Sequence, residues 1–197
     1  MAKKLFLTLS IIAFFASCGG RNTATSDRGV VINGVRWATR NVDVPGTFAE
    51  NPEDFGMLFQ WNRRKGWNSI DRSAEGWDSF CIPEGVGWKI ENDPCPEGWR
   101  VPTNDELKSL QRVVSISINR NGVNGRLFGI PPNQIFLPYA GWRSSFSGAF
   151  LDASRRGSYW SSTQYCTEGA WGAILLYGII ISNHARGHGN SVRCVAK

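Results

Sequence analysis

One segment of this chain has the pattern of a helix, and its isolation limits the fold class. Thr103 and Glu106 have the spacing of a capping box, and Pro102 stands just before the cap. An apolar face follows, formed by Leu107, Leu110, Val113 and Val114. We therefore expect a helix over residues 103–114 that packs on a sheet. One main helix among many short strands predicts an α+β fold.

The other regular segments read as short, mostly antiparallel strands separated by Gly, Ser and Asn. The Asn33-Gly34 pair between two apolar runs predicts a hairpin over residues 30–42. The remaining strands are expected at residues 57–59, 135–142, 149–151, 159–162, 170–177, 179–184 and 192–195. Residues 62–98 are rich in Gly, Trp and turn formers and show no sustained periodicity.

The N-terminus reads as an export signal. Lys3 and Lys4 precede an apolar core that is much shorter than the roughly 20 residues a membrane-spanning helix needs. Phe15-Ala16-Ser17-Cys18 resembles the lipobox of bacterial lipoproteins, in which the cysteine is lipidated. We expect residues 1–17 to be a signal peptide and residues 18–29 a lipid-anchored tether, with one domain over residues 30–197.

Charge and export together restrict the partners. Without Lys3 and Lys4 the chain has 20 basic and 16 acidic residues, a net charge of +4. The excess is dispersed, and Arg63-Arg64-Lys65 is its only tight cluster, whereas a nucleic-acid-binding protein needs a concentrated stripe. We expect no nucleic-acid partner, membrane attachment through the lipid alone, and a place in the cell envelope on either face of the outer membrane.

The last forty residues have an uneven organisation. Two orderly strips, Gly157–Thr163 and Asn190–Val195, enclose an irregular run with assorted side chains at residues 170–188. A regular frame around mixed side chains favours a display surface over a catalytic pocket.

The sequence lacks the common motifs of catalytic and metal-binding sites. The chain has no GxSxG elbow, P-loop or HExxH, and no cysteine or histidine pattern with zinc-ligand spacing. His184 and His188 are four residues apart but lie among Gly and Asn, which favours solvated loop histidines. We expect no enzyme activity, no cofactor and no metal.

Four ordered motifs resemble one family. They are Cys95–Thr103 (CPEGWRVPT), Phe136–Arg143 (FLPYAGWR), Tyr159–Thr163 (YWSST) and Ser191–Val195 (SVRCV). Together with residues 31–39 they resemble the Fibrobacter succinogenes major paralogous domain of exported bacterial lipoproteins. The resemblance implies a C-type-lectin-like fold related to formylglycine-generating enzymes, and it implies no settled activity.

Similar domains serve as variable ligand-binding proteins of diversity-generating retroelements, whose Asn codons near the C-terminus are rewritten. Residues 172–190 contain no Lys, Met, Glu, Gln or Trp, the residues that randomising the first two bases of an Asn codon cannot produce. This composition is compatible with such rewriting. Strand hairpins are depleted in several of these types in any case.

Four cysteines remain after Cys18, and they allow three disulfide connectivities. Cys95 and Cys194 each lie in a family strip, so we expect that pair; Cys81–Cys166 is the second expectation. Closing a loop of about 100 residues would stabilise the fold by roughly 4–5 kcal/mol in the chain-entropy model.

Strand alternation suggests where a ligand binds. If Trp171, Ala173 and Leu175 point into the core, Gly172, Ile174 and Leu176 point outward, and we expect Ile179 and Ile181 to continue that outer face. The candidate ligand-binding residues are Tyr165, Gly172, Ile174, Leu176, Tyr177, Ile179, Ile181, Asn183, His184, Arg186 and His188. An apolar centre with an aromatic and Arg/His rim suits an external protein ligand. The alternative is a hairpin buried on both faces.

Two other functions stay open. Trp67, Trp77 and Trp88 could stack on sugar rings in a carbohydrate-binding module or adhesin, although the calcium-binding motifs of sugar-binding lectins are missing. An enzyme remnant would use Cys166.

Overall fold

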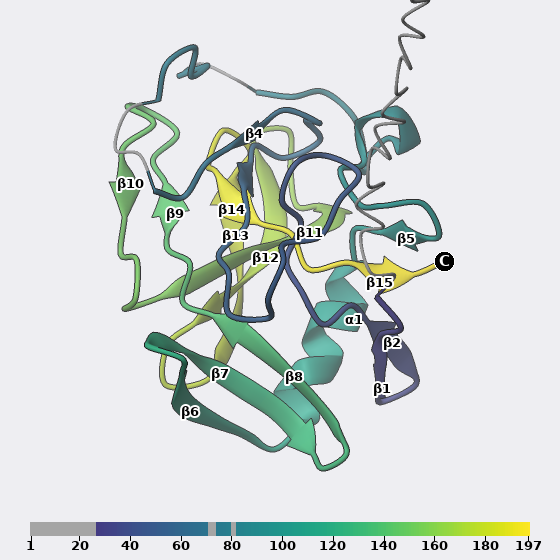
Figure 1. Ribbon diagram of the computed structural model, residues 1–197. Helices are drawn as coiled ribbons and strands as arrows, with labels where there is room; N and C mark the ends of the chain where they lie inside the picture. Colours follow the sequence, from purple (N-terminus) through teal and green to yellow (C-terminus); the bar gives the residue numbers. More distant parts are fainter. Residues whose placement is uncertain (1–26, 71–73, 80–81) are drawn as a thin grey trace, which may run out of the picture.

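A six-stranded sheet runs through the middle of the computed structural model, which describes residues 27–70, 74–79 and 82–197 (Figure 1). Its order across the sheet is β13 (Ile179–Ala185), β12 (Gly169–Leu175), β11 (Gly157–Gln164), β14 (Asn190–Ser191), β3 (Leu58–Phe59) and β4 (Gly66–Trp67). All neighbours are antiparallel except β11 and β14, which are parallel at Tyr159 and Ser191.

A four-stranded sheet brings the first and last described strands together. Its order is β1 (Val30–Ile32), β2 (Val35–Trp37), β15 (Val195–Ala196) and β5 (Trp99–Arg100). The predicted Asn33-Gly34 turn is confirmed: both residues have positive φ, 49° and 79°, as the tight turn of this hairpin requires.

The remaining strands of the described residues form two smaller sheets. The first comprises β6 (Ser115–Arg120), β7 (Val123–Ile130) and β8 (Asn133–Pro138), and the second pairs β9 (Trp142–Arg143) with β10 (Phe150–Leu151). Strands β6 and β7 were not expected from the sequence. The predicted strand over residues 192–195 is wrong, because Val192, Arg193 and Cys194 connect β14 in one sheet to β15 in the other.

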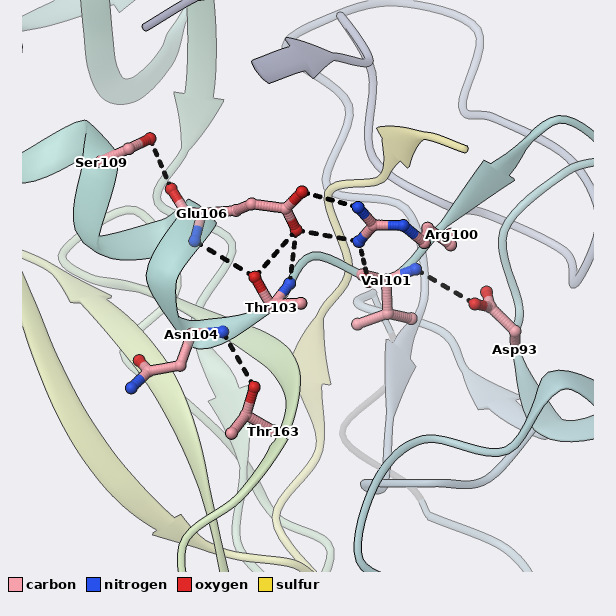
Figure 2. A network of polar contacts seen from close by, with 8 residues as sticks. All are labelled: Asp93, Arg100, Val101, Thr103, Asn104, Glu106, Ser109 and Thr163. Atoms are coloured by element: carbon pink, nitrogen blue, oxygen red, sulfur yellow. Dashed lines mark hydrogen bonds and ion pairs between the residues drawn. The ribbon is translucent and has the colours of Figure 1, made fainter. Parts of the chain in front are cut away.

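The helix begins where the sequence predicts. Thr103 accepts a hydrogen bond from the Glu106 amide, and the Glu106 carboxylate accepts one from the Thr103 amide (Figure 2). The same carboxylate accepts two hydrogen bonds from Arg100, at 2.9 and 2.6 Å. Burial opposes ionisation of Glu106, but the bonds from Arg100 and Thr103 prevail and lower its pKa.

The helix is shorter than predicted. Helix α1 covers Asn104–Ser109 and continues as the 3₁₀ turn η2 (Leu110–Arg112); a second 3₁₀ turn, η1 (Ile90–Asn92), lies before β5. Val113 is extended and Val114 is 69% exposed, so Val114 does not belong to the apolar face. Val113 and Val114 are β-branched, which favours extended backbone, and they lead directly into β6.

The core has two parts, one on each face of the large sheet. Leu107 and Leu110 of α1 and η2 pack with Tyr159, Ala173 and Leu175 on what we call the inner face. On the other face, which we call the outer face, Trp160 packs with Trp61 and Val192 beside the Cys95–Cys194 disulfide. The predicted Cys95–Cys194 pair is confirmed. Over the residues that the structure describes, the fold is mainly β-sheet with one short α-helix, which agrees with the expected α+β class at this level.

A buried arginine links the C-terminal strip to the rest of the fold. Arg193 is fully buried and donates two hydrogen bonds to Asn41 Oδ1, at 3.0 and 2.8 Å, and one to the Ala38 carbonyl. Asn41 in turn donates to the Phe55 carbonyl and to the Tyr159 hydroxyl. Burial lowers the pKa of Arg193 to about 10, which leaves it charged at neutral pH.

Replacing Asn41 by leucine should therefore leave the buried charge of Arg193 without its main hydrogen-bond acceptor. We expect Asn41→Leu to lower the free energy of unfolding by about 3–5 kcal/mol, measured by urea denaturation, because Arg193 keeps its charge and loses its main acceptor. Asn133→Leu, at an exposed strand position, is the matched control and should change it by about 0.5 kcal/mol or less. A loss below about 1 kcal/mol in Asn41→Leu would show that this bond is not a main support.

Candidate functional site

Strands β12 and β13 form the hairpin that the sequence singles out. Leu175 pairs with Ile179, Ile174 with Ile180 and Ala173 with Ile181, across a loop of residues 176–178. Directly opposite residues in an antiparallel pair point to the same face. The register therefore assigns each side chain of the hairpin to one face of the large sheet.

The predicted outward orientation of Ile179 and Ile181 is wrong. Both lie opposite core residues of β12 and pack on the inner-face cluster, partly buried. The three-residue loop pairs Leu175 directly with Ile179, so the inner face continues at Ile179 rather than at Ile180. A shift of one residue reverses every side chain of a strand.

The outer face of the hairpin is open at one end. Ile180 is 51% exposed and lies opposite the half-buried Ile174, with Ser182 next to it on β13. Tyr177, at the tip, is 98% exposed. We call these four residues the hairpin patch. Leu176, also predicted to bind, is half-buried in the loop, and its carbonyl accepts a bond from the Tyr139 hydroxyl.

At its other end the outer face is closed by His184. This side chain is 7% exposed, not a solvated loop residue as predicted, and its ring lies against Gly172, where a Cβ would come within 3.2 Å of it. Asn190 donates to Nδ1 at 3.3 Å, which puts the ring proton on Nε2 in this amide orientation. Nε2 is buried and has no hydrogen-bond partner among the described residues. Burial first, then His188 and Arg156, lower the pKa of His184 to about 4.

Arg186 is a structural residue rather than part of a solvated rim. It is 2% exposed and donates to the carbonyls of Pro83 and Cys166, at 2.6 and 2.7 Å. Its guanidinium also lies 4.4 Å from the centre of the Trp61 ring. These contacts tie the end of β13 to a loop about 100 residues earlier, so the predicted exposure of Arg186 is wrong.

Tyr165 and Asn183 do not face the patch. Asn183 lies opposite Trp171, and strand alternation puts Trp171 on the same face of β12 as the inner-face residues Ala173 and Leu175. Tyr165 packs on Trp171 with ring centres 4.9 Å apart, and Lys108 of α1 lies over the same ring. Both predicted ligand-binding residues are thus on the helix side of the sheet.

Several residues that border the patch were missed by sequence reasoning. Ser158 lies opposite Ile174 on β11, and Arg156 approaches Ser158 at 3.4 Å. Arg156 also lies 5.1 Å from the Trp142 ring, which His188 contacts at 4.8 Å. Burial, then Arg156, lower the pKa of His188. The length of the hairpin loop could have pointed to Ile180, but no local signal marks Arg156 or Trp142.

The tryptophans proposed for sugar stacking have internal partners. Trp67 is buried and packs on Trp77, whose indole N–H donates to the Ser145 carbonyl. Trp88 is half-buried and donates to the Asn92 carbonyl. These contacts favour a structural role for all three.

The cysteines differ in their bonding state. Cys194 is used in the disulfide, and Cys166 has an exposed free thiol. Cys81 and Cys18 lie outside the described residues, as do the signal peptide and residues 18–26 of the tether, so these assignments stay predictions. Among residues 27–70, 74–79 and 82–197, no three His, Cys, Asp or Glu side chains gather to hold a metal, and no helix is long and apolar enough to cross a membrane.

A cavity of about 470 Å³ lies away from the hairpin and was not anticipated. Its lining includes four carboxylates, those of Asp43, Glu50, Glu53 and Asp54. Glu53 accepts a hydrogen bond from Asn121 and pairs with Arg120, and Asp54 accepts from the Asn51 amide. Two of these carboxylates therefore hold loops together.

The family model described as the Fibrobacter succinogenes major domain matches residues 22–196. The chain belongs to this family. No curated protein and no solved structure matches it.

The four family motifs of this Fibrobacter succinogenes major domain form the frame around the hairpin. The motif at residues 95–103 carries a disulfide cysteine and the helix cap, and that at residues 136–143 ends β8 and forms β9. The motif at residues 159–163 lies in β11, and that at residues 191–195 carries Arg193 and Cys194. The hairpin lies between the last two motifs in sequence.

The buried histidine predicts a specific pH dependence. The folded-state pKa of His184, about 4, is below the unfolded value near 6.5, so the unfolded chain takes up the proton first as the pH falls. The stability that the neutral ring contributes is present above pH 6.5 and is lost towards pH 4, by up to about 3 kcal/mol.

Urea denaturation at several pH values measures this loss. We expect a smaller decrease of the unfolding free energy between pH 6.5 and 4 in His184→Gln, which keeps a polar partner for Asn190 and does not titrate. Identical pH profiles for the two proteins would contradict the buried, neutral state of His184.

Proposed function

We propose that this protein is an exported lipoprotein that binds an external protein ligand through the hairpin patch. The observation that carries the proposal is the outer surface of the hairpin, where the exposed side chains of Tyr177 and Ile180 lie near the half-buried Ile174. Exposed apolar centres with polar surroundings are typical of protein-binding surfaces.

The border of the patch supports a protein ligand. Arg156 supplies a cation beside Trp142 and the half-buried His188, and arginine and aromatic residues are enriched at the energetic centres of interfaces. We expect the partner to contribute an acidic or hydrogen-bond-accepting group opposite Arg156.

The edge of the sheet gives a second contact mode. Strand β13 lies at one end of the six-stranded sheet. None of the described strands pairs with its free edge, the edge away from β12. An extended segment of the partner can add main-chain hydrogen bonds along this edge while its side chains contact Ile180 and Ser182. A glycan has no equivalent of this pairing.

Export and anchoring rest on the sequence. The leader and Cys18 support a lipidated cell-envelope protein. The C-type-lectin-like fold and the origin as a variable protein of a diversity-generating retroelement are proposals supported by the family motifs. The pairing of β1, β2 and β15 next to the Cys95–Cys194 disulfide is compatible with the fold proposal. We propose a binding role without catalysis.

A pair of double variants tests the proposed surface. Peptides selected from a random phage-displayed library on the wild-type protein should bind Ile174→Ser/Ile180→Ser about 10-fold more weakly or worse, with a melting temperature within about 2 °C of the wild type. The matched control, Ile179→Ser/Ile181→Ser, changes the same residue types on the inner face. It should lower the melting temperature by about 5 °C or more, because partly buried apolar contacts are lost.

Unchanged peptide binding in the first double variant would show that the selected ligands bind elsewhere. A large loss of its stability would instead support a hairpin buried on both faces.

A further inference from the structure

The first described residue is held firmly to the domain. The Asp27 side chain is 1% exposed and accepts hydrogen bonds from the Thr39 amide, the Thr39 hydroxyl and the Gly29 amide, at 2.8, 2.9 and 2.8 Å. It also pairs with Arg40 at 3.5 Å. The domain thus begins at Asp27, two residues before the end of the predicted tether.

A tether from Cys18 to Asp27 is therefore short. Nine residues, 18–26, can span no more than about 30 Å however they are arranged. With Cys18 acylated, the side of the domain around Asp27 must stay close to the lipid headgroups.

An apolar groove opens at the first hairpin, a short distance along the chain from Asp27. It has a volume of about 300 Å³ and is lined by residues of the β1–β2 hairpin, the end of η2 and the β7–β8 turn. Val31, Val114 and Ile130 on its walls are 44%, 69% and 68% exposed. Val31 is four residues from Asp27, about 15 Å or less along the strand.

The charges around the groove favour anionic headgroups. Arg112 lines it, and none of its described lining residues is acidic. Arg28 and Arg36 are exposed; Arg36 lies opposite the groove residue Val31 on the paired strand and donates to the Arg28 carbonyl. Each basic side chain near an anionic lipid surface adds on the order of 1 kcal/mol of attraction.

We propose that the groove formed by Val31, Arg112, Val114 and Ile130 rests on the lipid surface to which Cys18 anchors the chain. The contact needs little intrinsic affinity, because a short tether gives an effective concentration on the order of millimolar. The inference depends on the lipid anchor in the proposed function.

This seating directs the hairpin patch away from the membrane. Ile32, Val113 and the β1–β2 hairpin pack on the inner face of the large sheet, whereas Ile174 and Ile180 lie on its outer face. The groove and the patch are thus on opposite sides of that sheet, which leaves the patch facing external partners.

Depth-dependent fluorescence quenching tests the seating on the acylated full chain. Cys81→Ser and Cys166→Ser remove the other candidate free thiols, and Ile130→Cys or Ile180→Cys then carries a bimane label. The proteins are reconstituted in vesicles of phosphatidylethanolamine and phosphatidylglycerol that contain a spin-labelled lipid. We expect the label at 130 to lose about half of its fluorescence or more and the label at 180 to stay unchanged.

Three results would overturn the inference. Equal quenching at both positions, or none at either, contradicts the orientation. A label at 130 that is shielded from iodide but not quenched by the lipid shows that protein covers the groove. A mass spectrum without the acyl group on Cys18 removes the anchor itself, whereas an acylated chain with an unquenched label at 130 defeats the seating alone.

Discussion

The bond between Arg193 and Asn41 holds together parts of the chain that no local structure connects. Arg193 lies in the link between the two main sheets, and Asn41 follows the first hairpin. Through Asn41 the network reaches the Tyr159 hydroxyl, which donates to the Pro138 carbonyl. Burial raises the pKa of Tyr159 to about 12, so its proton stays in place over the physiological range. A buried charge is tolerated only with such partners, which makes the arrangement specific.

The two faces of the large sheet differ in how far other parts of the chain cover them. Its inner face packs on the helix and the first hairpin, and much of its outer face is covered by Trp61, Trp160 and Val192. At the end of the outer face near the hairpin tip, Ile180 is exposed beside the half-buried Ile174. Because Arg186 and His184 close the other end with their own contacts, the patch can vary in sequence with little cost to the fold.

The sequence predicted the features that depend on neighbouring residues. The Thr103–Glu106 cap and the Asn33-Gly34 turn follow from local chemistry, and the Cys95–Cys194 pair follows from the family strips. The faces of Ile179 and Ile181 depended on the loop length, which alternation within each strand does not reveal. The burial of Arg186 depends on Pro83 and Trp61, more than 100 residues away, and no pattern near Arg186 indicates them.

The orientation of the hairpin is the claim on which the proposed ligand surface depends. Thiol reactivity measures it directly, with Ile180→Cys and Ile181→Cys compared in a chain that carries Cys81→Ser and Cys166→Ser. The account predicts that a maleimide reagent modifies the thiol at 180 on the order of 10-fold faster than the thiol at 181, since Ile180 points outward and Ile181 packs on the core. Equal rates, or faster modification at 181, would contradict it.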